Sequence, residues 1–180
     1  MKIFSLRDAS SRDTLGLILP SDPSRYIDLC ATESSIPRNL LELITIDPNF
    51  ALVAKAMKSS NPVIGQMADI TFRTLIERPG KIVCMGLNYA DHAKEGGNAR
   101  PEYPSFFMRG PSSLTAHLAP IIRPSVSDKL DYEAELAFIV GKKARNLTKE
   151  NALNCVAGYS IFNDASLRDY QRKTNQWTIG

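Results

Sequence analysis

The chain has 180 residues, of which 43% are hydrophobic, and its 22 basic and 19 acidic side chains leave a formal net charge of +3. This hydrophobic content is sufficient to bury a core, which excludes an intrinsically disordered chain. The nearly balanced charge excludes the strongly basic surface that nucleic-acid binding requires. No apolar run approaches the length of a signal peptide or a membrane span, so we expect a soluble, cytoplasmic protein.

The first part of the chain alternates between strand-like and helix-like patterns. Short apolar runs bounded by polar turns predict two strands, and apolar residues at helical spacing after a proline predict two helices. The turn-forming Arg78-Pro79-Gly80 predicts a boundary, so residues 1–77 are expected to form a small N-terminal α/β domain. The strands are expected at residues 2–5 and 15–19, and the helices at 37–44 and 48–57.

The remaining residues, 78–180, are dominated by strand-like runs. We therefore expect an α+β, mainly β body in this part rather than a doubly wound sheet. The expected strands are residues 82–85, 105–108, 132–140 and 156–163, and the expected short helices are residues 91–95, 149–155 (capped by Thr148) and 166–173.

The three cysteines, Cys30, Cys84 and Cys155, are odd in number and widely separated. This spacing predicts neither a disulfide framework nor a zinc site, because both require paired cysteines. Cys84 and Cys155 lie in apolar runs, where packed thiols are expected rather than nucleophiles.

Three carboxylates are the first candidates for chemistry: Glu133 and Glu135 in DYEAELAFIVG, and Asp164 in GYSIFNDASLRD. Side chains alternate along a strand, so the two glutamates lie on one face. At ~4 Å their repulsion is roughly 4 kcal/mol at an effective dielectric of about 20. A hard cation such as magnesium, manganese or calcium would offset it. The alternative is that both glutamates face solvent and that Asp164 caps a helix starting near Ser166.

His92 and Glu95 in GLNYADHAKEGG are three residues apart on a predicted short helix. This spacing puts both side chains on one face, where a carboxylate can orient the imidazole as a general base for water. The spacing is also that of an ordinary solvated pair on a helix, which spacing alone favours. Arg109 follows an apolar run, where it either clamps a substrate carboxylate or forms a structural ion pair.

Five segments in unbroken order resemble the fumarylacetoacetate hydrolase family, most closely its acylpyruvate hydrolase and 2-hydroxyhepta-2,4-diene-1,7-dioate isomerase branch. The similarity runs from about Pro79 to the last residue. It implies a mixed β-sandwich roll with a small N-terminal domain, and a homodimer. The segments are KIVCMGLNYADHAKEGG, PEYPSFFMRGPSSL, LDYEAELAFIVG, VAGYSIFNDASLRDYQ and QWTIG.

The resemblance also implies roles for single residues. Glu133, Glu135 and Asp164 would hold Mg²⁺ or Mn²⁺, with Ca²⁺ as a further candidate. His92 and Glu95 would form a dyad that activates water. Substrate binding would fall to Tyr89 and Arg109, and Arg109 stands where many family members carry a lysine.

The function implied is hydrolysis of a C–C bond in a short 2-oxo acid, such as an acylpyruvate formed in aromatic catabolism. Isomerisation or tautomerisation of related dienes and oxaloacetate-type decarboxylation are alternatives, because they use the same metal–enolate chemistry. The family places a catalytic lysine directly after W-T-x-G, whereas this chain ends at Gly180. We therefore expect unpaired strand edges and exposed apolar surface, and a silent truncated paralogue or binding protein is the second functional class.

Overall fold

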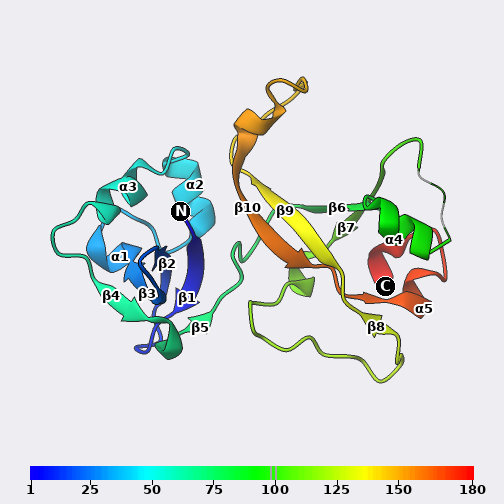
Figure 1. The fold of residues 1–180 in the computed structure, drawn as a ribbon, viewed down its shortest axis with the longest axis horizontal. Helices are drawn as coiled ribbons and strands as arrows, with labels where there is room; N and C mark the ends of the chain where they lie inside the picture. Colours follow the sequence, from blue (N-terminus) through cyan, green and yellow to red (C-terminus); the bar gives the residue numbers. More distant parts are fainter. Residues whose placement is uncertain (98, 100) are drawn as a thin grey trace. The chain divides into compact units, whose positions relative to one another are not determined.

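The computed structural model describes residues 1–97, 99 and 101–180, except for the side chains of His92 and Glu95. The chain folds into two compact units, which are coloured along the sequence in Figure 1. Unit 1 comprises Met1–Glu77, Thr115–Pro120 and Ala134–Phe162, and unit 2 comprises Arg78–Leu114, Ile121–Glu133 and Asn163–Gly180.

Unit 1 contains a five-stranded antiparallel sheet in the order β4-β3-β2-β1-β5. Its central strand, β2, places Leu15 and Leu17 in the core, because alternate side chains of a strand face the same side. The strands are β1 (Ile3–Arg7), β2 (Asp13–Leu19), β3 (Asp22–Asp28), β4 (Ile64–Gln66) and β5 (Thr71–Phe72).

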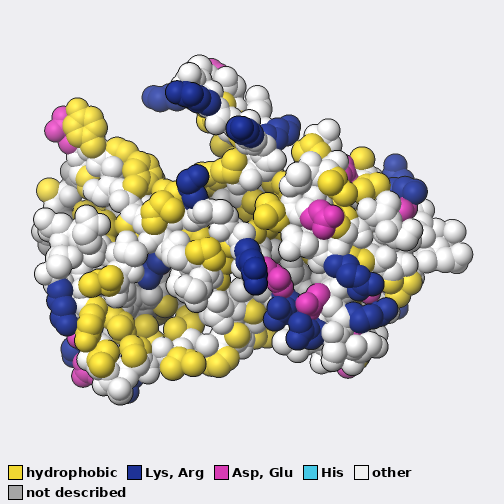
Figure 2. Space-filling model, turned by 180° about the vertical axis from the view of Figure 1, so that it is seen from behind, with side chains coloured by type: hydrophobic (Ala, Val, Ile, Leu, Met, Phe, Trp, Pro, Cys, Tyr) yellow, Lys and Arg dark blue, Asp and Glu magenta, His cyan; other side chains and the backbone are white. Residues whose placement is uncertain are grey.

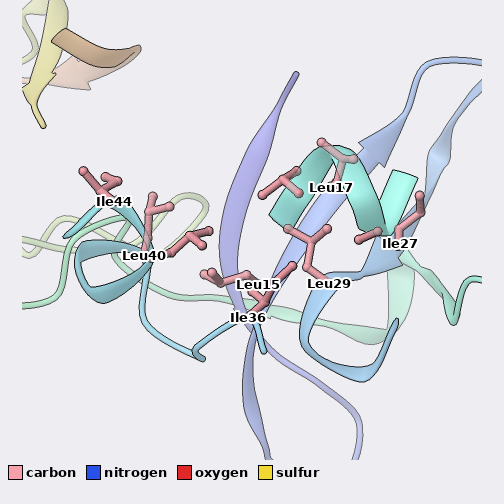
Figure 3. Close-up of a cluster of buried hydrophobic side chains, with 10 residues drawn as sticks. Leu15, Leu17, Ile27, Leu29, Ile36, Leu40 and Ile44 are labelled. Atoms are coloured by element: carbon pink, nitrogen blue, oxygen red, sulfur yellow. The ribbon is translucent and has the colours of Figure 1, made fainter. Parts of the chain in front are cut away.

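Three helices, α1 (Leu29–Thr32), α2 (Leu40–Ile46) and α3 (Ala51–Met57), enclose the core of unit 1. The Asn39 side chain caps α2, because its Oδ1 accepts hydrogen bonds from the backbone N–H groups of Leu41 and Glu42. Leu40, Leu43 and Ile44 are buried at helical spacing, and Figure 3 shows how side chains from this helix lie beside those of β2 and α1.

An ion pair joins the end of α1 to α3. The Lys55 ammonium lies 2.5 Å from Oε2 of Glu33, whose other oxygen accepts a hydrogen bond from the Ser35 hydroxyl at 2.6 Å. These hydrogen bonds, first that of Lys55, lower the pKa of Glu33 from 4.5 to about 2. Because the pKa is depressed on folding, the charged carboxylate stabilises the fold above pH 4.5, and this contribution is lost as the pH falls through about 2.

We expect Glu33→Gln to lower the thermal midpoint at neutral pH, with a difference from the wild-type chain that shrinks as the pH falls from about 4.5 to about 2. Thermal melts monitored by circular dichroism across this range would measure the difference. The exposed Glu102 supplies the control, because Glu102→Gln removes a surface carboxylate elsewhere. A constant difference for Glu33→Gln at every pH would contradict the prediction.

Strands β9 (Ala134–Val140) and β10 (Val156–Asn163) pair with each other. Hydrogen bonds from the Gly141 N–H to the Cys155 carbonyl and from the Asp164 N–H to the Glu133 carbonyl close the two ends, so the strands are antiparallel. One face packs Ile139 and Ala157 against the core of unit 1.

The other face of this strand pair is apolar and exposed. Leu136, Phe138 and Val140 are at least 60% exposed, and Ile161 of β10 is 85% exposed. Figure 2 shows apolar side chains, in yellow, at the surface in several patches. Apolar side chains are therefore exposed on the face of β9 opposite to Glu135.

Unit 2 is built on the antiparallel pair β6 (Ile82–Gly86) and β7 (Ser105–Arg109), in which Ile82 lies opposite Arg109 and Gly86 opposite Ser105. A second pair, β8 (Leu130–Asp131) and β11 (Ser166–Leu167), leads into α5. The helical elements of this unit are α4 (Ala90–Glu95), α5 (Arg168–Gln171), η2 (Pro111–Ser113) and η4 (Trp177–Ile179), and unit 1 adds η1 (Met67–Asp69) and η3 (Ala152–Cys155).

Two predicted helices are shorter than expected. The one over 149–155 is reduced to η3, and the Asn151 side chain accepts from the Thr148 N–H instead of Thr148 acting as a cap. The one over 166–173 starts as strand β11, because Ser166 pairs with Asp131, and becomes helical only at Arg168. Tertiary pairing outweighs local helix propensity here.

The mainly β, α+β class is confirmed by the described elements. Among the described residues, no helix is long and apolar enough to cross a membrane. The chain passes from unit 1 to unit 2 at Glu77–Arg78 and returns to unit 1 twice later in the sequence, so the division into 1–77 and 78–180 stays a prediction.

Candidate metal centre

Asp164 follows β10 directly and is almost completely buried, with 4% of its surface exposed. Its backbone N–H donates to the Glu133 carbonyl at 2.9 Å, and the Glu133 N–H donates to Oδ1 of Asn163 at 3.1 Å. These two bonds tie the segment before β9 to the segment after β10. They bring the carboxylates of Glu133 and Asp164 close enough to repel each other.

A guanidinium balances the charge of Asp164. Nε and Nη2 of Arg109, at the end of β7, both lie 2.6 Å from Oδ1 of Asp164. The two side chains are 12% and 6% exposed, so this is a buried ion pair. The structural ion pair, one of the two alternatives for Arg109, is thus present. A substrate contact of Arg109 stays a prediction.

Burial shifts the pKa of Asp164. Removal of the carboxylate from water raises its pKa above the usual 3.8, and the neighbouring charge of Glu133 acts in the same direction. Arg109 and a hydrogen bond from the Cys84 thiol oppose the shift without cancelling it. A buried carboxylate with a raised pKa is typical of a functional site.

A second arginine, Arg168, balances the charge of Glu133. Nη1 of Arg168 donates to Oε1 of Glu133, and Nε and Nη2 both lie 2.9 Å from Oδ2 of Asp131. The Glu133 side chain is only 14% exposed, so the solvent-facing alternative is wrong for this residue. The helix-cap alternative for Asp164 is also wrong, because Leu167 precedes α5 and forms no side-chain cap.

Sequence reasoning assigned no role to Arg168 and treated Cys84 as a packed thiol. In the structure, Arg168 binds Glu133, and Cys84 contributes a hydrogen bond to Asp164. A signal for Arg168 was present in the N-D-x-S-x-R-D pattern of residues 163–169. In this pattern an arginine follows Asp164 by four residues, and in the structure that arginine is the first residue of α5. Nothing in the pattern around Cys84 distinguished it from the other two cysteines.

The other predicted site residues are described less completely. Glu135 is half-buried on the glutamate face of β9 and belongs to unit 1. His92 and Glu95 lie on α4, but their side chains are outside the described part, so the dyad stays a prediction. Tyr89 precedes the same helix and is 40% exposed.

The chemistry of the acidic pair decides whether a divalent cation fits. Glu133 and Asp164 offer only oxygen ligands, and they repel each other, so a hard cation such as Mg²⁺ or Mn²⁺ fits this donor set. Within the described residues, no three His, Cys, Asp or Glu side chains converge as a metal-binding group. Arginines provide the positive charge beside both carboxylates in this structure.

Comparison with known proteins matches residues 81–180 to the family model "Fumarylacetoacetate (FAA) hydrolase C-terminal". The mitochondrial oxaloacetate tautomerase fahd2 of Xenopus laevis is 38% identical over 168 residues, which cover 92% of this chain and 52% of that protein. The chain spans about half the length of the curated relatives it matches.

Solved structures agree in fold. The fumarylacetoacetate hydrolase of Exiguobacterium antarcticum is 31% identical with a TM-score of 0.76, and the match covers 100% of this chain and 61% of that one. A maleylpyruvate hydrolase of Sphingobium sp. SYK-6, solved with manganese(II) and pyruvate, is 22% identical with a TM-score of 0.74 over 98% of this chain and 63% of that one.

Proposed function

Because this chain belongs to the fumarylacetoacetate hydrolase family, we propose that it serves metal-dependent hydrolysis of a carbon–carbon bond in a short 2-oxo acid, such as an acylpyruvate. The observation that carries the proposal is the buried Asp164 beside Glu133. The manganese(II) and pyruvate in the structurally similar maleylpyruvate hydrolase support the same metal and substrate class.

The proposed ligands are Glu133, Glu135 and Asp164, and the proposed metal is Mg²⁺ or Mn²⁺, with Ca²⁺ as a weaker candidate. When bound, a divalent cation would attract the 2-oxo group and the carboxylate of the substrate, and it would stabilise the negative charge that develops when the carbon–carbon bond breaks. The ligands' own task is to remain charged and oriented. Burial works against the charge of Asp164, and Arg109 opposes this effect; Arg168 forms an ion pair with Glu133.

We propose that two residues of α4, His92 and Glu95, carry out the proton transfers. One imidazole nitrogen of His92 takes a proton from water, and the hydroxide attacks the distal carbonyl of the substrate. The carbon–carbon bond then breaks to release a carboxylic acid and an enolate, and the enolate carbon takes the proton back from His92. Glu95 accepts a hydrogen bond from the other nitrogen and keeps the ring in the required tautomer. Tyr89 and Arg109 are the proposed contacts for the substrate, and we further propose a cytoplasmic homodimer.

A tautomerase of oxaloacetate is the second candidate, favoured by the names of several relatives that are 31–38% identical. Both reactions abstract or deliver a proton next to a 2-oxo acid, but only the hydrolase breaks a carbon–carbon bond. Mass spectrometry of the product therefore separates them, since a tautomer keeps the mass of its substrate.

The proposal is tested by the loss of acylpyruvate absorbance with Mn²⁺, compared with the same assay in EDTA. We expect turnover to disappear in His92→Ala with Mn²⁺ binding retained, because a base is lost but no ligand. Glu135→Ala should lose both turnover and Mn²⁺ binding, because a proposed ligand is removed. The control is Asp128→Asn, whose side chain is 77% exposed. Undiminished turnover in His92→Ala and Glu135→Ala would refute the assignment, and Mn²⁺ binding without any turnover would favour a silent binding protein.

A further inference from the structure

The guanidinium of Arg109 holds three consecutive residues at once. Besides its two contacts with Oδ1 of Asp164, Nη2 lies 3.3 Å from the Ala165 carbonyl and 3.3 Å from the Ser166 hydroxyl. The Ser166 hydroxyl in turn donates to the Asp164 carbonyl at 3.1 Å, and Ser166 is fully buried. The side chain and backbone of Asp164 are therefore tied to one rigid group.

Both nitrogens of Arg109 that reach Asp164 bind the same oxygen, Oδ1, so Oδ2 is outside the contact with Arg109. The Cys84 thiol is a further hydrogen-bond donor to this carboxylate. A ligating carboxylate must keep its charge and its orientation, and hydrogen bonds to the non-ligating oxygen supply both. We propose that Arg109 is a positioning residue that holds Oδ1 of Asp164 and leaves Oδ2 as the oxygen for a divalent cation. This inference rests on the proposed metal-dependent function.

The far side of Arg109 is held by an aromatic stack. Its guanidinium carbon lies 5.8 Å from the centre of the Phe107 ring, and the Trp177 ring meets Phe107 edge-on with centroids 5.8 Å apart. Trp177 fits there because Gly86 has no side chain: a Cβ at that position would lie 2.0 Å from the Trp177 ring. These contacts pack aromatic rings beside the guanidinium that binds Asp164.

An arginine is required for this arrangement. Its planar fork donates from several nitrogens in fixed directions, whereas a lysine ammonium is a single point on a flexible stem. A lysine at position 109 would preserve the charge but would lose the simultaneous contacts with Oδ1, the Ala165 carbonyl and the Ser166 hydroxyl. We therefore expect a lysine at position 109 to balance the charge of Asp164 but not to hold its carboxylate in the same orientation.

The experiment is a titration of the full chain with Mn²⁺, in which electron paramagnetic resonance measures the free ion. We expect Arg109→Gln to raise the Kd for Mn²⁺ about 10- to 100-fold, the usual effect of losing a partner of a ligand. Arg109→Lys should fall between this variant and the wild type. Arg7→Gln is the matched control, because it removes another two-point arginine–aspartate pair, with Asp13 in the sheet of unit 1.

Thermal midpoints without metal are measured in parallel, because a purely structural role would lower the midpoint of Arg109→Gln and leave the Kd unchanged. A Kd within twofold of the wild type, or a tighter Kd, overturns the inference. If Arg109→Gln does not fold, Arg109→Lys decides by the same criterion. Absence of Mn²⁺ binding by the wild-type chain would refute the proposed function and this inference together, whereas wild-type binding with unchanged variants refutes the inference alone.

Discussion

Replacement of Asp164 by alanine is expected to lower the free energy of unfolding by about 3–5 kcal/mol in metal-free buffer. The loss follows from the partner that remains: Arg109 is 12% exposed and would keep its charge in a site without a carboxylate. The same variant should bind no Mn²⁺, so Mn²⁺, which we expect to stabilise the wild-type chain, should leave the midpoint of the variant unchanged. Urea unfolding with EDTA, and again with Mn²⁺, measures both effects.

Asp131→Ala provides the control for this prediction. Asp131 also pairs with an arginine, but its side chain is 48% exposed, and Arg168 would retain Glu133 as a partner. We expect a loss of less than about 1 kcal/mol. The double variant Asp164→Leu with Arg109→Met should recover most of the stability and none of the Mn²⁺ binding, because it removes both buried charges. Equal losses in Asp164→Ala and Asp131→Ala would contradict the prediction.

Local patterns were sufficient to predict most helices and strands but not how each strand face is covered. The alternation predicted for residues 132–140 placed Glu133 and Glu135 on one face, but the observed strand β9 begins at Ala134 and contains only Glu135. The face of β9 that carries Leu136 and Phe138 has the apolar pattern of a buried face, yet it is exposed in this chain. Burial depends on what packs against a strand, and a period of two residues contains no information about that partner.

Strand β3 was not predicted, because its sequence DPSRYID contains a proline and polar residues. It forms because β2 and β4 pair with its two edges, and Tyr26 and Ile27 reach the core. The adjacent strand β2 and the distant strand β4 provide hydrogen bonds on both edges, and the composition of β3 alone does not predict this pairing.

The site shows the same division between local and tertiary information. The acidic residues were identified because carboxylates near one another need a positive charge. Which arginine pairs with which carboxylate was not predicted, because Arg109 lies 55 residues before Asp164 and Arg168 lies 35 residues after Glu133. Only the fold brings each arginine to its carboxylate, through β7 in one case and the start of α5 in the other.

The core of unit 1 should respond to mutation independently of these charges. Leu43 of α2 is fully buried, so Leu43→Ala is expected to lower the free energy of unfolding by about 2–5 kcal/mol through lost burial and the cavity left behind. Leu41→Ala is the matched control on the same helix, because Leu41 is 42% exposed and its loss should change stability by no more than about 0.5 kcal/mol. Urea unfolding measures both, and similar losses would show that α2 does not bury this face. Since Leu43 has no part in the acidic pair, its folded variant should keep the wild-type Kd for Mn²⁺, which separates a general loss of stability from the specific loss expected for Asp164→Ala.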